Sequence, residues 1–185
     1  MTTAFDHRWN VIIQTTDPGL AQSGAVCFQK PLRDVVPSPL PLPFLGAYLV
    51  HPTHGDLELL TGLLQSAYEL EDAAQPALRL RLRDYFSTST ARPLLDGSWI
   101  CFVDGTPVSA CLISLARGTK TPHITDLMTA APWQGHGLAT VVLEKSFHAL
   151  VEKGFSAVRL LCSDGTAPLV RHLKKIGFTA IGESA

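Results

Sequence analysis

A change of pattern near residue 130 limits the folds open to this chain. Upstream of it, strand candidates follow one another at 98–103, 107–116 and 123–129. The first two flank Asp104-Gly105-Thr106, and Asp-Gly between such segments is a strong signal for a tight hairpin. Downstream, candidate helices from 138 and 166 alternate with apolar strand candidates. An antiparallel meander followed by this alternation predicts a mixed sheet covered by helices, in the α/β (α+β) class.

The segment between 47 and 97 predicts one more strand, at 47–50, and at least one helix. Apolar residues with a 3.6-residue period mark that helix: Leu57, Leu60, Leu64 and Tyr68. The next segment, ALRLRLRDYF, is ambiguous. Its Leu/Arg alternation over 78–83 is typical of a strand, but Leu78, Leu82, Tyr85 and Phe86 also form one helical stripe. The period alone leaves both interpretations open.

The first 45 residues differ from the rest and are expected to form an N-terminal arm ahead of a domain at 46–185. They contain two short strand candidates, at 9–13 and 25–28, and then alternating prolines at 37–43. Proline fixes φ and removes a backbone donor, so the prolines predict an extended strap.

Composition excludes several classes of protein. The 185 residues have a formal net charge of −1, without the clustered basic residues that nucleic-acid binding requires. No apolar run approaches the roughly 18 residues of a membrane helix, and the first residues do not resemble a secretory signal. The 4 cysteines form no CxxC pair and have no histidine at a zinc-type spacing, which indicates free thiols and no metal. These features predict a cytoplasmic protein with small-molecule partners.

The segment Gln134-Gly135-His136-Gly137-Leu138-Ala139 joins a predicted strand to a predicted helix. In this place successive backbone N–H groups and the positive end of the helix dipole favour a phosphate or pyrophosphate. Glycine allows the backbone to approach such a group closely. The segment is neither a P-loop nor a dinucleotide-binding GxGxxG, and on its own it is equally compatible with an ordinary tight turn.

In this strand-to-helix context, Gln134-x-x-Gly137-x-Ala139 resembles the Q/R-x-x-G-x-G/A signature of GNAT acetyltransferases. The segment 166–178, TAPLVRHLKKIGF, is similar to the second motif of that family, N-x-P-A-x-x-L-Y-x-K-x-G-F. The predicted order of elements from 47 to 181 is also that of GNAT proteins. The resemblance implies a GNAT acyl-CoA N-acyltransferase fold with an N-terminal extension, and it implies that ALRLRLRDYF is a helix.

By the same resemblance the cosubstrate is acetyl-CoA. The amides from Gly135 to Ala139 would hold its pyrophosphate, and the strand backbone before them would bond its pantetheine arm. The implied cofactor-binding residues are Leu127, Met128, Thr129, Gln134, Gly135, His136, Gly137, Leu138, Ala139 and Thr166. Trp133, just before the loop, is either a lid on the cofactor or a packing residue.

His123 is the leading candidate for the catalytic base, because counting back from the loop places it where some GNAT branches carry a base. A histidine titrates in the range that proton transfer near neutral pH needs. Thr125 would share its strand face, and strict alternation would place the rival Asp126 on the opposite face. An exposed histidine without a role is the alternative. Glu69, Glu71 and Asp72 could attract a cationic acceptor or form a solvated loop.

Two departures from the family pattern stand out. Leu173 replaces the tyrosine that often protonates the departing thiolate. This leaves His172, Ser163, Cys162 or water for that step, unless CoA leaves as the thiolate. The sequence also stops before the usual seventh strand. An open sheet edge is unfavourable, so we expect the arm to pair with the sheet, in the same molecule or across a homodimer.

The favoured function is therefore transfer of an acetyl group from acetyl-CoA to a primary amine of a small molecule or peptide, by direct attack of the amine on the thioester. The alternative is a CoA-binding module of the same fold with little or no activity, which Leu173 would favour. An unrelated phosphate-binding α/β protein is a third, weaker interpretation. The helices at 56–86 offer no readable code for the acceptor.

Overall fold

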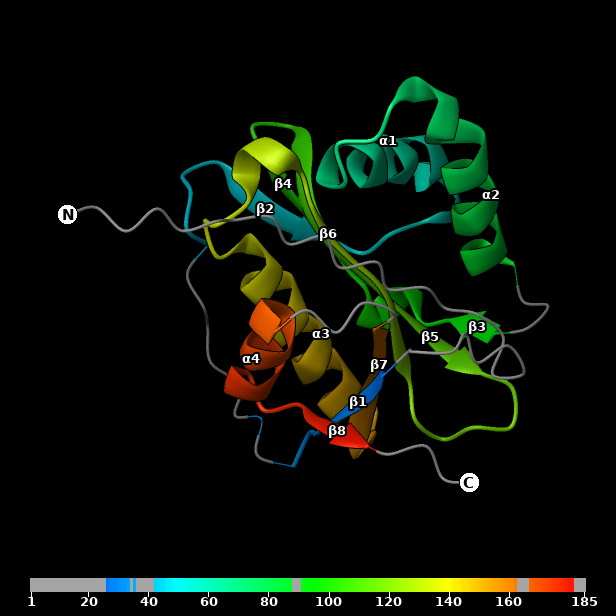
Figure 1. Cartoon of the computed structure of the whole chain (residues 1–185), viewed down its shortest axis with the longest axis vertical. Helices are drawn as coiled ribbons and strands as arrows, with labels where there is room; N and C mark the ends of the chain where they lie inside the picture. Colours follow the sequence, from blue (N-terminus) through cyan, green and yellow to red (C-terminus); the bar gives the residue numbers. More distant parts are fainter. Residues whose placement is uncertain (1–25, 34, 36–41, 88–90, 163–166, 182–185) are drawn as a thin grey trace.

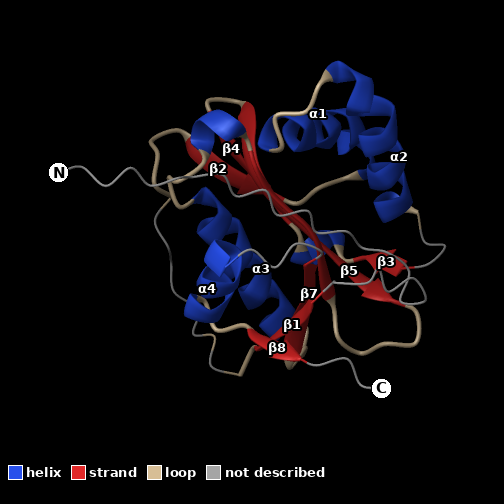
Figure 2. Cartoon of the chain, in the orientation of Figure 1, coloured by secondary structure: helices blue, strands red, loops and turns tan. Residues whose placement is uncertain are grey.

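The computed structural model describes residues 26–33, 35, 42–87, 91–162 and 167–181, with the side chains of 162 and 167–169 left aside. Eight strands form one mixed sheet in the order β2-β4-β5-β6-β7-β1-β8, and β3 pairs with β5 off this path. Helices α1 and α2 lie on one side of the sheet, and α3 and α4 lie on the other (Figures 1 and 2). This arrangement is the mixed α/β sheet that the sequence predicts.

The strands are β1 Val26–Pro31, β2 Ala47–Val50, β3 Ala91–Pro93, β4 Trp99–Val103, β5 Thr106–Ala116, β6 His123–Thr129, β7 Ala157–Cys162 and β8 Thr179–Ile181. The helices are α1 Leu57–Ala67, α2 Gln75–Phe86, α3 Leu138–Glu152 and α4 Ala167–Lys175. No helix in the described ranges is both long and apolar enough to cross a membrane.

The hairpin predicted around Asp104-Gly105 is confirmed as β4 and β5. Asp104 has a φ of 48° and Gly105 a φ of 79°. Positive φ at both central residues is what the tightest hairpin turns require, and it explains the preference for Asp-Gly there. β6 continues the meander antiparallel to β5, as the pattern predicts.

The ambiguous segment ALRLRLRDYF is a helix, α2. Leu82, Tyr85 and Phe86 are buried in one cluster with Leu60 and Leu64 of α1. A strand over 78–83 would have directed leucine and arginine to opposite faces, whereas the helix gathers the apolar residues on one side. The helical stripe therefore prevails over the alternation, as the resemblance to GNAT proteins implies.

The second core lies on the other face, between the sheet and helices α3 and α4. Leu138, Val142 and Leu150 of α3 pack there with Leu173 of α4 and Phe178. Full burial of each such side chain contributes roughly 1.5–3 kcal/mol relative to exposure. The helix α3 ends at Glu152, with Lys153 as its C-cap. Gly154 follows with a φ of 81°, a left-handed conformation typical of the residue after a C-cap.

Strand β1 comes from the N-terminal segment and lies inside the sheet. It pairs antiparallel with β7 over its whole length and with β8 from Cys27 to Gln29. Phe28 is 1% exposed and belongs to the core between the sheet and α3. The final antiparallel pair of the sheet is thus β1 with β8, made within one chain. The predicted strand at 9–13 and most of the proline strap lie outside the described residues.

Candidate active site

The loop between β6 and α3 begins with a short 3-10 helix, Ala131–Trp133, and ends at Gly137, the N-cap of α3. Gly135 and Gly137 both have left-handed φ values, 79° and 80°. A side chain is rarely tolerated in this conformation, so glycine is needed at both positions for the loop to turn into the helix. Local backbone geometry therefore explains the two glycines that the sequence singles out.

The start of α3 presents free backbone donors. Within the described residues, no backbone carbonyl accepts a hydrogen bond from the N–H groups of Gly135 to Ala139. The first N–H groups of a helix have no partner in the helix itself, and the helix dipole places partial positive charge there. A Cβ added at Gly137 would meet no described atom within 4 Å, so there is open space beside the backbone of this residue. This combination suits an anionic group such as a phosphate.

Gln134 holds the loop in place through its side chain. Its Nε2 donates to the carbonyl oxygen of Ala67 at the end of α1, at 3.0 Å, and to that of Thr129 at the end of β6, at 3.1 Å. The amide thus ties together the loop, α1 and β6. The Gln134 side chain therefore anchors the loop to two neighbouring elements.

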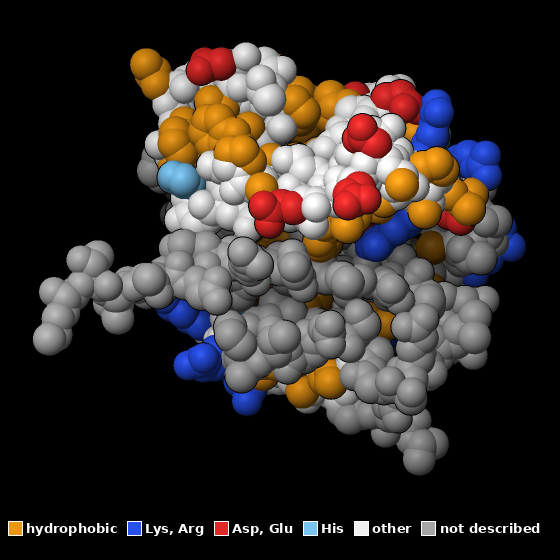
Figure 3. Space-filling view, turned by 45° about the horizontal axis from the view of Figure 1, so that its top comes forward, with side chains coloured by type: hydrophobic (Ala, Val, Ile, Leu, Met, Phe, Trp, Pro, Cys, Tyr) orange, Lys and Arg blue, Asp and Glu red, His pale blue; other side chains and the backbone are white. Residues whose placement is uncertain are grey.

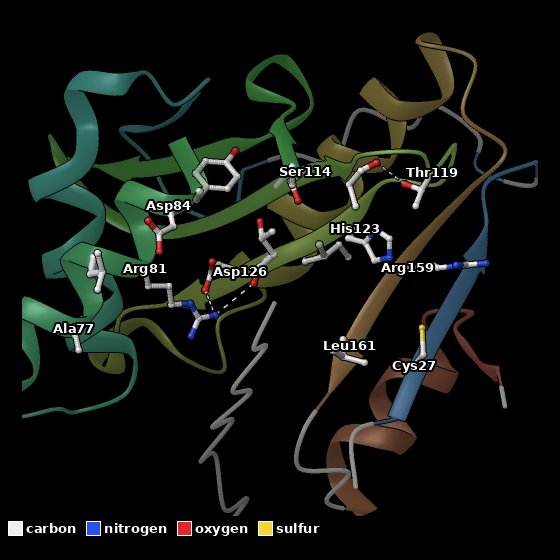
Figure 4. A pocket seen from close by; sticks show the side chains of 16 residues that line it. Cys27, Ala77, Arg81, Asp84, Ser114, Thr119, His123, Asp126, Arg159 and Leu161 are labelled. Carbon is white, nitrogen blue, oxygen red and sulfur yellow. Dashed lines mark hydrogen bonds and ion pairs between the residues drawn. The ribbon is translucent and has the colours of Figure 1, made fainter. Parts of the chain in front are cut away.

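The strands β6 and β7 separate beside this loop. They are parallel neighbours and pair only at His123 with Arg159 and at Ile124 with Leu160. From Thr125 to Thr129 the edge of β6 that faces β7 has no strand partner in the described part of the chain, and the two strands diverge (Figure 4). An open strand edge of this kind can bond an extended amide-bearing chain, as the added strand of a peptide complex does.

A cavity of about 590 Å³ lies against the sheet on the side of α2. Residues from α2 and five strands line it, in the region where β6 and β7 begin to separate (Figure 4). Most of the lining is apolar, with Leu80, Ala116 and Leu161 among its members. The charged and titratable residues in the lining are Cys27, Arg81, Asp84, Tyr85, His123, Asp126 and Arg159. A largely apolar cavity with a few converging polar groups is the usual form of a small-molecule site.

The expectation that Asp126 faces away from His123 is wrong. Leu112 and Ile113 are consecutive on β5, but their partners on β6 are Asp126 and Ile124. Thr125 is therefore the extra residue of a β-bulge, which resets the alternation of side chains along the strand. As a result both His123 and Asp126 line the cavity. Thr125 donates its hydroxyl to the carbonyl oxygen of Leu112 at 2.9 Å.

His123 lies at the end of β6 where the two strands are still paired. Burial lowers its pKa below the ordinary 6.5, and the positive charge of Arg159 lowers the pKa further. Its Nδ1 is buried and has no hydrogen-bond partner among the described residues. A half-buried imidazole that stays neutral at physiological pH is suited to accept a proton.

Asp126 is joined to α2 by an ion pair. Arg81 Nη2 donates to Asp126 Oδ1 at 2.5 Å, and the same nitrogen lies 3.5 Å from the carbonyl oxygen of Thr125. Burial raises the pKa of Asp126 to about 7, although Arg81 acts to lower it. The charged partner offsets part of the cost of burying the carboxylate.

The other predicted site residues have varied surroundings. Met128 is buried in the cluster under α1, and Leu127 packs against the opposite core, so only their backbone is available to a ligand. The exposed His136 ring bonds the Gln134 carbonyl oxygen through Nδ1 at 2.9 Å. Leu138 is 1% exposed, so it too offers only its backbone. Thr166 lies outside the described residues.

The alternatives left open around the loop are partly resolved. Trp133 makes an edge-to-face contact with Phe44, with ring centroids 5.1 Å apart, which favours the packing role over the lid. Leu173 is 3% exposed in the core and carries no proton donor. Glu69, Glu71 and Asp72 are exposed and do not line the cavity. Acidic side chains are visible on the face that includes α1 and α2 (Figure 3).

Sequence reasoning did not identify the two arginines of the cavity. Arg81 belongs to the ambiguous Leu/Arg segment. Its place opposite β6 becomes clear only once that segment is known to be a helix. Arg159 lies in an apolar strand, and a lone charged residue in such a strand is a signal that could have been used. Three cysteines in the described residues, Cys27, Cys101 and Cys111, are free thiols. No group of three His, Cys, Asp or Glu residues in those ranges could hold a metal ion.

Comparison with known proteins gives a family match and several structural ones. The family model described as the acetyltransferase (GNAT) family matches residues 57–178, which contain α1, the meander, the loop, α3 and α4. No curated protein matches the sequence significantly.

Solved structures of similar fold share little sequence with this chain. A GCN5-related N-acetyltransferase from Sphaerobacter thermophilus has a TM-score of 0.64 at 17% identity, over 85% of this chain and 48% of that one. A tandem GNAT protein from the clavulanic acid biosynthesis pathway has a TM-score of 0.59 at 16% identity, over 84% of this chain and 50% of that one. The chain thus spans about half the length of these two structures, and the likeness concerns the fold.

Proposed function

Because the chain belongs to the GNAT acetyltransferase family, we propose that it transfers an acetyl group from acetyl-CoA to a primary amine of a small molecule or peptide. The observation that carries this proposal is the loop of free amides at the start of α3, beside the open edge of β6. The cavity on the α2 side of the sheet adds room for an acceptor where the two strands begin to separate.

The residues present fit the cosubstrate. The N–H groups from Gly135 to Ala139 would bind the pyrophosphate, where the missing side chain of Gly137 leaves space. The β7-facing edge of Leu127 to Thr129, which has no strand partner among the described residues, would bond the amide groups of the pantetheine arm. Acetyl-CoA supplies an activated acetyl group as a thioester.

In the proposed mechanism His123 accepts the proton that the acceptor amine loses as it attacks the thioester carbonyl. Its lowered pKa keeps the imidazole neutral and able to accept at physiological pH. Asp126 and Arg81 contribute a charged pair to the same cavity and polarise it. Leu173 is buried and apolar and cannot supply a proton to the departing thiolate, and we assign that step to water.

Leu173 also favours the second candidate, a CoA-binding module of this fold with little activity. The two candidates differ in one measurement. With acetyl-CoA and a panel of amines, an enzyme releases free thiol in proportion to acetylated amine. A binding module binds acetyl-CoA and releases no thiol above the rate of spontaneous hydrolysis.

Binding at the loop is tested by the thermal stability of the protein with acetyl-CoA. A ligand that binds only the folded state raises the melting temperature. We expect a rise with acetyl-CoA, a much smaller rise with pantetheine, and none in Gly137→Val, whose side chain fills the phosphate space.

The matched control for this variant is Gly118→Val. Gly118 also has a left-handed φ, 77°, and open space around its Cβ position, but it lies in the turn between β5 and β6. Both substitutions strain the backbone in the same way, so only the cofactor response separates them. Equal rises in the two variants would show that the pyrophosphate binds elsewhere.

A further inference from the structure

A row of polar residues crosses five strands on the cavity side of the sheet. Successive register partners are Ser114 on β5, His123 on β6, Arg159 on β7, Gln29 on β1 and Thr179 on β8. Side chains of register partners lie on the same face, and neighbouring strands are about 4.8 Å apart. Arg159 is thus the register partner of the candidate base on the neighbouring strand, and both residues line the cavity (Figure 4).

Among the described residues, Arg159 has no anionic partner. Its Nε donates to Gln29 Oε1 at 3.0 Å, and its backbone N–H donates to the Pro122 carbonyl oxygen at 2.9 Å. No carboxylate in the described part of the chain pairs with its guanidinium, although the residue is half-buried. Charged side chains that leave the surface are usually paired, so this one lacks the counter-ion that such a position calls for.

The remaining charges of the cavity lie toward α2. Asp126 forms an ion pair with Arg81, and Asp84 lies exposed on α2 (Figure 4). Cys27 and Tyr85 are the other titratable groups in the lining, and neither carries charge at neutral pH, because burial raises the pKa of both. Among the described lining residues, the positive charge at the end of the cavity with His123 and Arg159 is thus uncompensated.

We propose that Arg159 binds a carboxylate group of the acceptor, so that the acceptor is an amino acid or another small amine that carries a carboxylate. The inference rests on the proposed acetyl transfer. A guanidinium group bonds a carboxylate through two parallel N–H donors. Gln29 of the N-terminal strand holds Arg159 at Nε, which leaves the N–H donors of both Nη atoms for a carboxylate. An amine a few bonds from that carboxylate reaches His123 on the neighbouring strand. The apolar lining accommodates the rest of the acceptor.

The phosphates of the cosubstrate are the other anions to consider, and the fold separates them from Arg159. The loop at 134–139 follows the far end of β6, and His123 lies at its beginning. A seven-residue strand spans roughly 20 Å, so a phosphate held at the start of α3 lies far from Arg159. The acceptor is therefore the source of the carboxylate.

The first test compares matched acceptors. L-alanine, L-leucine and β-alanine are each assayed against their primary amides, with acetyl-CoA as the donor. We expect the wild type to favour the carboxylates and Arg159→Gln to lose about 10- to 100-fold in kcat/KM for them, as expected for a charge-assisted hydrogen bond. The amides should change by less than about threefold. Arg92→Gln, which removes an exposed arginine from β3 outside the cavity lining, should match the wild type with every acceptor.

The second test reads binding without catalysis. An anion at Arg159 neutralises the charge that lowers the pKa of His123, so acetate should raise that pKa in the wild type when the imidazole is followed by NMR. Arg159→Gln should show no such response to acetate. Because this readout needs no turnover, it separates failure of the carboxylate site from failure of the proposed acetyl transfer.

The outcomes are distinct. If no amine is acetylated but acetate still raises the pKa of His123 in the wild type and not in Arg159→Gln, the carboxylate site stands and the proposed function fails. If amides react as well as carboxylates and acetate acts equally on both proteins, the carboxylate site is wrong. A loss in Arg159→Gln that appears with succinyl-CoA but not acetyl-CoA would place the carboxylate on the acyl chain and overturn the assignment to the acceptor.

Discussion

His123 and Asp126 show how one extra residue in a strand changes the chemistry of a site. The bulge at Thr125 turns both side chains toward the cavity, where burial acts on them in opposite directions. Desolvation disfavours the charged form of each group, so the pKa of the histidine falls and that of the carboxyl rises. The carboxyl group is thereby brought toward the range in which it exchanges protons near neutral pH, whereas the imidazole stays neutral there and able to accept a proton.

We expect His123→Ala to lose roughly 10² in kcat/KM while acetyl-CoA affinity is unchanged. A general base must be neutral to act, so activity falls as the pH drops through the pKa of His123. Because burial and Arg159 lower this pKa, the acidic limb of kcat/KM should lie below pH 6.5. His54→Ala, at an exposed histidine beyond the cavity lining, is the control. A variant at position 123 as fast as the wild type at every pH would assign the base elsewhere.

Asp126 should make stability depend on pH. Its pKa is about 7 in the folded protein against an ordinary 3.8, so the folded state keeps a proton that the unfolded chain has already lost. This contribution to the free energy of unfolding is complete below about pH 4 and is lost as the pH rises through about 7. The free energy of unfolding of the wild type should therefore decrease between about pH 4 and pH 7. In Asp126→Asn we expect this decrease to be smaller by about 1–3 kcal/mol, measured by urea unfolding at several pH values.

The control for this measurement is Asp84→Asn, at an exposed carboxylate of the same cavity. Its free energy of unfolding should follow the wild-type pH dependence. The two variants are compared by the slope of the free energy of unfolding against pH. The absolute value is unsuitable, because Asp126→Asn also removes the ion pair with Arg81. An unchanged slope in Asp126→Asn would mean that Asp126 is ionised throughout this range.

At the scale of elements, the loop before α3 is held by contacts that lie outside it. Gln134 connects the loop to the last carbonyls of α1 and β6, and Trp133 packs on Phe44. The free amides at the start of α3 keep their direction because these two side chains fix the backbone before them. Positioning by rigid neighbouring elements is what a preorganised anion site requires.

We expect Gln134→Glu to weaken both the fold and cofactor binding. A carboxylate cannot donate to the carbonyl oxygens of Ala67 and Thr129, so both lose a partner at a cost of about 1–3 kcal/mol in the free energy of unfolding. Acetyl-CoA affinity, measured by calorimetry, should fall as the loop loosens. Gln75→Glu, at an exposed glutamine on α2, should leave that affinity unchanged. Wild-type affinity in Gln134→Glu would show that the loop keeps its shape without this anchor.

For the whole molecule, the position of β1 joins the N-terminal segment to the last strand of the sheet. β7 and β8 do not pair with each other, and β1 lies between them. Without β1, β7 would lose a neighbour along its whole length and β8 would have no strand beside it among the described residues. Strand β1 therefore contributes to the same sheet and core as α3.

We expect Phe28→Ala to lower the free energy of unfolding by about 3–5 kcal/mol in a single transition, as for other large-to-small core substitutions. Phe28 is 1% exposed, whereas Val26 on the same strand is 36% exposed, so Val26→Ala should cost far less. Denaturant unfolding followed by far-UV circular dichroism and by fluorescence checks both variants. Equal, small effects would show that β1 adds little to the core.

Much of the fold follows from local patterns in the sequence. The Asp104-Gly105 turn, the apolar stripe of α1 and the glycines of the loop each depend on neighbours a few residues away, so they can be recognised along the chain. The strand β3 could not be predicted, because three residues that include Pro93 carry no periodic signal. The roles of the loop residues and of His123 remain predictions.

The sequence by itself determined the class of fold, the strand-to-helix loop and its two glycines, because backbone conformation there is set by local sterics. The residue pattern of α2 fitted both a strand and a helix, and only the tertiary structure decided between them. The tertiary structure also decided that β1 lies between β7 and β8 and which side chains meet in the cavity. A bulge at one residue reverses every later side chain of a strand, and the contact of Arg81 with Asp126 spans 45 positions. Such features depend on how distant segments pack, which the order of residues along one segment does not encode.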